Sequence, residues 1–323
     1  MIEEMLPGLY RMEIRLPKSP LKATNSYLIR GEDRCLVVDT GFNRKECRQD
    51  ILDSLHRLGV DPGNVDFFVT HLHADHLGLV CDMTGPRSKV YFNRQELYLA
   101  YPEERYWEQR KQDFKSHGFT EGEISKAMDR HPGRIFGLQR PVDFTVVEDG
   151  DYLTVGPYSF QCVQTPGHTP GHMCLYEAAH KVLLAGDHIL RDITPNITNW
   201  PGTVDSLGHY LQSLDRVYAL EVTLLLPGHR SIVTDHRARI DELKAHHMAR
   251  LQEVTSALEE GEKCAFAVAP WVTWDIGFNS WQEFPPTQKV FAVGEVLAHL
   301  EYLEGRGLVH RRLDDGKVVF GRL

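Results

Sequence analysis

Short apolar runs alternate with amphipathic stretches over the first two-thirds of the chain. The runs at 27–30, 35–40 and 65–70 are rich in β-branched and aromatic residues, which predicts strands, whereas the spacing at 44–58 predicts a helix. A second helix is predicted at 205–220, where leucines recur on one face. Further strands are predicted at 158–165, 173–178, 181–187 and 222–228. Several strands for each helix predict an α/β fold built as a layered sandwich.

One segment, residues 93–135, departs from this pattern because it is polar, rich in aromatic residues and helical in character. We expect it to be an insertion that forms a helical cap over a site, with a helix pair packed on the sandwich as the alternative. In the first case, Tyr106 and Trp107 are candidate substrate-binding residues, because they could form an apolar wall.

The last third of the chain begins with a long predicted helix from 235 to about 260, which Gly261 ends. Helical spacing returns at 294–304, and the chain finishes as a strand, an Asp-Gly turn and a second strand. A helix followed by a hairpin predicts a small winged-helix-like module. We therefore expect a first domain at 1–262 and this module at 263–323.

Composition narrows the class of protein. The 323 residues are 42% hydrophobic and 25% charged, as in ordinary globular proteins, and the net charge of −9 argues against a surface built to hold phosphate backbones. The apolar runs are too short to span a bilayer, and the acidic N-terminus has no apolar signal core. The six cysteines form no C-x-x-C pair. These features predict a cytoplasmic protein with no membrane partner.

The stretch THLHADHLG, residues 70–78, places His71, His73, Asp75 and His76 within six positions. Neutral imidazole and carboxylate are the ligands that zinc and its neighbours prefer. Three further apolar strands end in a residue of the same kind, which are His168 in TPGH, Asp187 in AGD and His229 in PGH. Because strand ends form a rim on which side chains can converge, the pattern predicts a metal site.

The number of these side chains indicates how many ions the site holds. Five imidazoles and two carboxylates are too many for one tetrahedral zinc, yet they suit two ions that share a bridging ligand. Two ions about 3.5–4 Å apart can hold a hydroxide between them and polarise the bond under attack. We expect two divalent ions, zinc first, with Mn²⁺ or Fe²⁺ as substitutes.

The succession H-x-H-x-D-H, T-P-G-H, G-D and P-G-H, over roughly residues 8–235, resembles the metallo-β-lactamase superfamily. The resemblance implies a four-layer αβ/βα sandwich with a dinuclear metal site. It implies that one ion is held by His71, His73 and His168, the other by Asp75, His76 and His229, and that Asp187 bridges them. Asp39, in VVDTG, matches an aspartate that orients groups near the site.

Several other residues receive narrower predictions. Asp75 and Asp187 are the candidate catalytic carboxylates, and Asp75 could also orient the attacking water. His172 and His188 lie next to predicted ligands, so we expect each to support a ligand or to contact substrate, with an ordinary buried histidine as the alternative. The adjacent pair His246/His247 lies in a predicted helix, where neighbouring positions do not share a face, and is predicted not to be a ligand pair.

Three classes of function compete. The metal site favours hydrolysis of a small-molecule ester, thioester or lactone. A phosphodiesterase or endoribonuclease of the β-lactamase-like type is the alternative that the tail suggests, but residues 281–323 carry six basic and six acidic side chains, which argues against a nucleic-acid partner. A mononuclear iron dioxygenase or a non-enzymatic metal-binding protein is the third class. Pairing of the chain into a homodimer is left open.

Overall fold

The computed structural model describes residues 1–275, 277–278 and 280–323, which divide into two units. Unit 1 comprises residues 1–101, 136–195 and 213–239, and unit 2 comprises residues 102–135, 196–212 and 240–323. The division does not follow the single boundary predicted between 262 and 263, because most of the predicted insertion groups with the C-terminal part of the chain.

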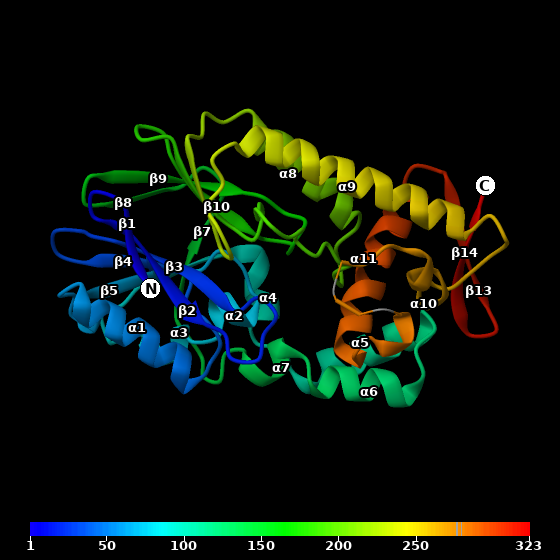
Figure 1. The fold of residues 1–323 in the computed structure, drawn as a ribbon. Coiled ribbons are helices and arrows are strands. Elements are labelled where there is room, and N and C mark those ends of the chain that lie inside the picture. The colour runs from blue at the N-terminus through cyan, green and yellow to red at the C-terminus, as the bar shows by residue number, and fades with distance from the viewer. Residues whose placement is uncertain (276, 279) are drawn as a thin grey trace. The chain divides into compact units, whose positions relative to one another are not determined.

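Unit 1 contains two β-sheets (Figure 1). The first has seven strands in chain order: β1 (Ile2–Leu6), β2 (Leu9–Arg15), β3 (Ala23–Ile29), β4 (Cys35–Val38), β5 (Val65–Phe68), β6 (Val90–Asn93) and β7 (Phe144–Val147). Strands β1 to β4 pair antiparallel, and β4 to β7 pair parallel.

The second sheet has the strand order β12–β11–β10–β9–β8. Its strands are β8 (Tyr152–Val155), β9 (Tyr158–Gln164), β10 (Met173–Glu177), β11 (Val182–Gly186) and β12 (Leu224–Pro227). Only the β11–β12 pair among these strands is parallel. Strands β9 to β12 fall on the four later apolar runs of the sequence, so those predictions are confirmed.

The central strands of the first sheet, β3, β4 and β5, are buried on both faces. Val37 and Phe67 pack with α1 (Lys45–Arg57), whereas the next residues, Val38 and Phe68, pack with apolar side chains of the second sheet. This alternation follows from the two-residue period of a strand. It explains the continuous apolar runs that predicted these strands, and it confirms the layered α/β sandwich.

The chain also contains several short helices. They are α2 (Ala74–Leu77), α3 (Val80–Met83), α4 (Leu97–Ala100) and α7 (Pro132–Phe136), with 3₁₀ turns at Pro62–Asn64 and Arg94–Glu96. The two longer helices predicted from leucine spacing and helix-ending signals are α8 (Ser206–Tyr218) and α9 (His236–Ala257).

Unit 2 is mainly helical. It holds α5 (Glu104–Ser116), α6 (Glu121–Asp129), α10 (Ala265–Val268) and α11 (Pro286–Glu304), 3₁₀ turns at Ala269–Trp271 and Trp281–Glu283, and a hairpin of β13 (Val309–Asp314) and β14 (Lys317–Arg322). The helical character of the insertion and the C-terminal helix plus hairpin are confirmed. Helix α11 begins earlier than predicted, since Pro286 fits the first helical turn. The hairpin turns at Asp315 and Gly316, whose φ angles of 44° and 75° are of the sign that a type I′ turn needs.

Two further findings concern the cysteines and the helices. Five of the six cysteines are buried, Cys264 is half-buried, and all six are free thiols. Across the described ranges, the structure contains no helix with the length and apolar character that crossing a membrane requires.

Candidate metal centre

Four of the predicted ligands come from one short stretch after β5. The strand ends at Phe68, His71 and His73 lie in the loop that follows, and Asp75 and His76 lie in the single turn of α2. His71 and His76 are completely buried. A tight loop that leads directly into a helical turn can therefore present four donor side chains from six residues.

The other three predicted ligands follow strands of the second sheet. His168 follows β9, Asp187 follows β11 directly, and His229 lies two residues beyond β12. The glycine before His229 is required by close packing, because a Cβ atom on Gly228 would lie 2.4 Å from Asp187 Oδ1 and 2.8 Å from His76 Cε1. As the sequence predicted, the ends of these strands bring the side chains to one place.

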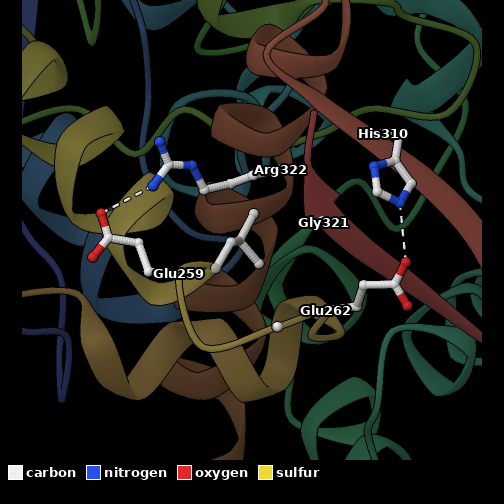
Figure 2. Close-up of a pocket in the computed structure, with 7 residues that line it drawn as sticks. Glu259, Glu262, His310, Gly321 and Arg322 are labelled. Atoms are coloured by element: carbon white, nitrogen blue, oxygen red, sulfur yellow. Dashed lines mark hydrogen bonds and ion pairs between the residues drawn. The ribbon is translucent and has the colours of Figure 1, made fainter.

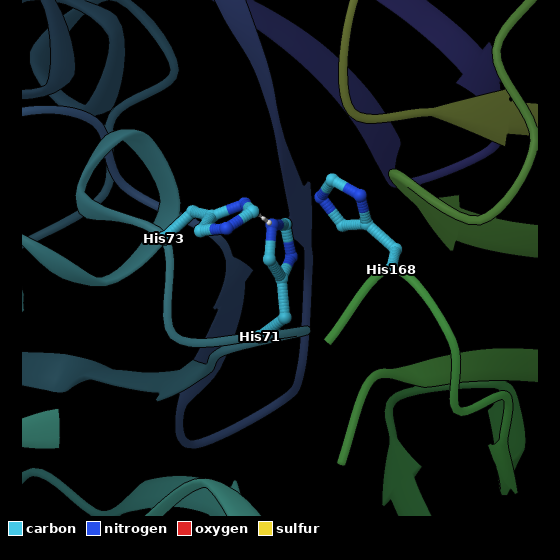
Figure 3. Close-up of side chains that lie close together, drawn as sticks. All are labelled: His71, His73 and His168. Atoms are coloured by element: carbon cyan, nitrogen blue, oxygen red, sulfur yellow. Dashed lines mark hydrogen bonds between the residues drawn. The ribbon is translucent and has the colours of Figure 1, made fainter. Parts of the chain in front are cut away.

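The seven side chains form three overlapping clusters in which the donor atoms lie within 4.8 Å of one another. The clusters are His71, His73 and His168; His71, His76 and Asp187; and Asp75, His76 and His229. In the first cluster, the imidazoles of His71 and His73 meet edge-on, with His71 Nε2 and His73 Nδ1 3.1 Å apart, and His168 lies on the other side of His71 (Figure 3). The first and third clusters are the two ligand sets that the family resemblance implied.

Asp187 lies between these two sets. One of its carboxylate oxygens is 3.5 Å from His76 Nε2, and the other is 3.4 Å from His229 Nε2 and 3.7 Å from His168 Nε2. Asp75 approaches the same nitrogen of His229, at 3.4 Å. A carboxylate that contacts imidazoles of both sets is placed as a bridging ligand would have to be.

The two halves of the centre differ in their electrostatics. Burial, together with the neighbouring histidines, lowers the pKa of His71 well below its usual value and that of His73 to about 3, so both imidazoles are neutral. Burial also tends to lower the pKa of His76 and His229. The charge of Asp187 outweighs this effect and raises both pKa values, that of His229 to about 10. Neutral nitrogen donors thus lie beside carboxylates that attract positive charge, which is the environment of a cation site.

The residues fit divalent metal ions. His76 Nε2 and His229 Nε2 are 3.3 Å apart, nearly as close as the His71–His73 pair, and nitrogen lone pairs at that distance repel unless a proton or a metal ion lies between them. Asp187 Oδ1 is buried and accepts no hydrogen bond from the residues that the structure describes. Imidazole and carboxylate are also the donor set that zinc prefers.

Hydrogen bonds behind the centre orient the donor nitrogens. Thr70 donates its backbone N–H and its hydroxyl to Asp39, both at 2.8 Å, so the hydroxyl oxygen accepts from His71 Nδ1 at 2.9 Å. Asp39 also lies 2.7 Å from His76 Nδ1, and the carbonyl of Ala23 lies 2.7 Å from His229 Nδ1. In their neutral form, these three imidazoles donate through Nδ1 and direct the lone pair of Nε2 into the centre. Asp39, for which the resemblance implied an orienting role, is therefore in contact with the predicted ligand His76.

His172 and His188 are buried beside the centre. His172 Nε2 accepts the backbone N–H of Asp187 at 3.1 Å, and its Nδ1 lies 2.8 Å from Thr165 Oγ1. Nε2 thus holds the strand end that presents Asp187, and Nδ1 contacts the residue that follows β9, the strand before His168. The ring of His188 lies 6.1 Å from that of His172, and burial lowers the pKa of His188 to about 3.

Glu96 is a residue of the centre that the sequence patterns did not reveal. It is completely buried, and its two carboxylate oxygens each accept a backbone N–H at 2.6 Å, one from Leu72 and one from Gly171. Leu72 separates His71 from His73, and Gly171 belongs to the loop that carries His168. Burial raises the pKa of Glu96 to about 7. One carboxylate therefore ties together the two loops that present the first ligand set.

The two aromatic candidates for substrate binding belong to unit 2. Trp107 is only 6% exposed, and its ring packs on His131 and on the edge of Tyr106 at centroid distances of 5.2 Å. Trp107 is thus part of the packed interior of α5 and its neighbours. The substrate-binding role of Tyr106 and Trp107 stays a prediction.

A separate pocket of about 380 Å³ lies in unit 2 (Figure 2). Glu259 pairs with Arg322 and Glu262 with His310 across it, each at 3.0 Å. The pocket contains none of the predicted ligands, and its carboxylates are already paired with basic side chains. It is therefore a hollow lined by ion pairs, with no predicted metal ligand.

Comparisons with known protein families agree with this geometry. Residues 20–229 match the model of the Metallo-beta-lactamase superfamily, and residues 251–323 match the model described as Metallo-beta-lactamase-like, C-terminal domain. The first match covers most of unit 1 and every predicted metal ligand. The chain therefore belongs to the metallo-beta-lactamase superfamily.

Individual relatives extend the match over nearly the whole chain. The structure superposes with a TM-score of 0.85 on a metallo-beta-lactamase family protein of Thermus thermophilus, at 31% identity over 99% of this chain and 100% of that one. The chain is 25% identical to the probable metallo-hydrolase YqjP of Bacillus subtilis, over 91% of this chain and 92% of that protein.

The chain is also similar to proteins that are longer than itself. It is 26% identical to the atrochrysone carboxyl ACP thioesterase of Emericella nidulans, over 81% of this chain and 68% of that protein. This chain matches 62% of the length of the lactamase-like protein aptB of Emericella nidulans. It matches 60% of the length of the lactamase-like protein adaB of Aspergillus niger. The fold and family are thus shared across relatives of different length.

Proposed function

We propose that this protein is a metal-dependent hydrolase that cleaves the thioester, ester or lactone bond of a small acyl substrate. The observation that carries the proposal is the convergence of seven imidazole and carboxylate side chains in three overlapping clusters. Similarity to a protein named as an ACP thioesterase supports a substrate with an activated acyl group. Similarity to a probable metallo-hydrolase supports the reaction class.

The ligand assignment in this proposal follows the clusters. His71, His73 and His168 would hold one ion, Asp75, His76 and His229 would hold the other, and Asp187 would contact both. Zinc suits these donors best, and manganese or iron could replace it. When bound, the ions supply a water molecule activated at neutral pH and polarise the carbonyl under attack.

Asp75 would orient the attacking water. Burial alone would raise the pKa of this carboxyl, but His229 and His76 outweigh it and lower the pKa to about 2, so Asp75 is a hydrogen-bond acceptor at neutral pH. The water oxygen forms a bond to the acyl carbon, and the carbon–sulfur or carbon–oxygen bond breaks. The leaving thiol or alcohol takes the proton that the water loses, and the other product is a carboxylic acid.

Metal removal tests the proposal directly. We expect the metal-free chain to be inactive on thioesters, esters and lactones, and zinc to restore turnover of at least one of them as two ions bind at the centre in unit 1. The measurements are elemental analysis and hydrolysis assays on the same samples, with a phosphodiester in the panel. Absence of metal uptake would refute the metal centre. Turnover of the phosphodiester alone would favour the nuclease alternative.

The nuclease alternative requires that the C-terminal hairpin bind RNA, and its ion pairs argue against this. Arg311 pairs with Glu304 at 3.0 Å, and Arg312 forms an ion pair with Glu262. Guanidinium groups that are already neutralised supply little of the phosphate attraction on which RNA affinity depends. We expect no salt-sensitive binding of single-stranded or duplex RNA in fluorescence anisotropy. RNA binding that weakens steeply with salt would contradict this expectation.

A further inference from the structure

A second group of donor side chains lies inside unit 2. His246 and His247 of α9 and Glu295 of α11 each place one donor atom within 4.8 Å of the other two. His247 is completely buried and Glu295 is 5% exposed. Helix geometry alone predicted that the adjacent histidines are not a ligand pair. That prediction did not take into account the carboxylate from a second helix, which lies near both rings.

Hydrogen bonds fix the tautomer of His247. Burial lowers the pKa of both His247 and His299, so the two imidazoles are neutral. His299 Nδ1 lies 2.7 Å from the carbonyl oxygen of Glu295, which can only accept, so this nitrogen carries the hydrogen. His299 Nε2 is then an acceptor, and His247 Nδ1, 3.1 Å away, must donate to it. The hydrogen of His247 is thus on Nδ1, and Nε2 carries a lone pair.

This lone pair has no hydrogen-bond donor in the described part of the chain. His247 Nε2 is buried and makes no hydrogen bond there, although an unpaired buried acceptor costs free energy. A ring that donates through one nitrogen to a fixed acceptor and leaves the other bare has the arrangement of a metal-binding histidine. The same arrangement recurs in unit 1, where Nδ1 of His71 and of His229 each donates to a fixed oxygen.

The carboxylate of Glu295 retains capacity for a cation. One oxygen accepts from the guanidinium of Arg250 and the other from Asn196 Nδ2 at 2.8 Å, and each oxygen has a second lone pair. Arg250 is held in place by the carbonyl of Thr273 at 2.7 Å and by the ring of Trp274, whose centroid lies 4.4 Å away. Because the guanidinium already compensates the charge of Glu295, a cation should bind here more weakly than in unit 1.

We propose that His246, His247 and Glu295 bind one divalent cation of the zinc type, with water in its remaining position. Two imidazoles and one carboxylate are a donor set that zinc accepts. Since the donors come from α9 and α11, the ion would tie these two helices together and stabilise unit 2. The site stands apart from the proposed hydrolysis, because none of its residues is a predicted ligand of the centre in unit 1.

The test is zinc binding by the full-length chain. Metal-free wild-type protein and the variants His247→Gln and His246→Gln are dialysed against buffered zinc, and bound metal and hydrolytic activity are measured. His209→Gln is the matched control, because it removes an exposed imidazole of α8 within unit 2. We expect wild type and control to bind one ion more than either variant and all four proteins to keep the same activity.

A measurement on the unmodified chain decides the case even if a variant fails to fold. Coordination should move the ¹⁵N resonance of His247 Nε2 away from the range of an unprotonated, unbound imidazole nitrogen as zinc is added. Equal zinc content in wild type and His247→Gln, or an Nε2 resonance that stays unchanged at saturating zinc, would overturn the proposal. A buried water would then be the partner of this nitrogen.

Discussion

Replacing Asp187 with alanine is expected to abolish or severely weaken the binding of both proposed ions and to lower the rate of hydrolysis by about a thousandfold or more, since the ions would supply several kcal/mol of transition-state stabilisation. The carboxylate lies 3.4 Å from His229 and 3.7 Å from His168, so its loss affects both ligand sets. Asp187 is also the main group that raises the pKa of His76 and His229, so its loss should lower both pKa values. Metal content and kcat/KM are the measurements.

The matched control for this variant is Asp192→Ala. Asp192 is an exposed carboxylate of unit 1, five residues beyond Asp187, and it forms a loose ion pair with Arg191 at 3.9 Å. The control should keep wild-type metal content and turnover. If Asp187→Ala retained both ions and full activity, the assignment of Asp187 as the shared ligand would be wrong.

Replacing Glu96 with alanine is expected to weaken zinc binding about 10- to 100-fold, the effect typical of residues that orient metal ligands. The change also leaves the buried N–H groups of Leu72 and Gly171 without their acceptor, at a cost of about 1–3 kcal/mol each. Glu96→Gln keeps one acceptor oxygen and should show a smaller loss. Competition with a chelator of known affinity measures zinc binding, and denaturant unfolding measures stability.

Glu148→Ala is the control for the Glu96 variants, because Glu148 is an exposed glutamate of unit 1 that pairs with Arg94 at the surface. It should leave zinc affinity and stability unchanged. A Glu96→Ala protein that is less stable but binds zinc as tightly as wild type would show that Glu96 serves packing and does not position the ligands.

Much of the fold was predictable because burial repeats along the chain with a regular period. Val37 and Val38, or Phe67 and Phe68, are apolar in succession because one packs with helices and the other with the second sheet. The hairpin was predictable for a local reason, since Asp315 and Gly316 are residue types that tolerate positive φ. Division of the chain into two units was not predictable, because segments far apart in the sequence form unit 2.

The metal centre was predictable where ligands stand at strand ends next to glycine or proline, as His168 and His229 do. Glu96 was not, because it lies in no motif and its hydrogen bonds join residues 24 and 75 positions away. The environment of His247 was hidden for the same reason, since the partner that fixes its tautomer is His299 of another helix. Long-range contacts of single side chains leave no periodic signal in a sequence.

The predicted ligands come from both sheets of unit 1, since His71 follows β5 and His229 follows β12. Ions held as proposed would therefore bind only to the folded protein. The free energy of unfolding must then rise with the concentration of free metal. At one hundred times the dissociation constant, each ion adds about 2.7 kcal/mol. The supply of metal in the surrounding solution would thus govern how long the protein survives proteolysis, as well as whether it is active.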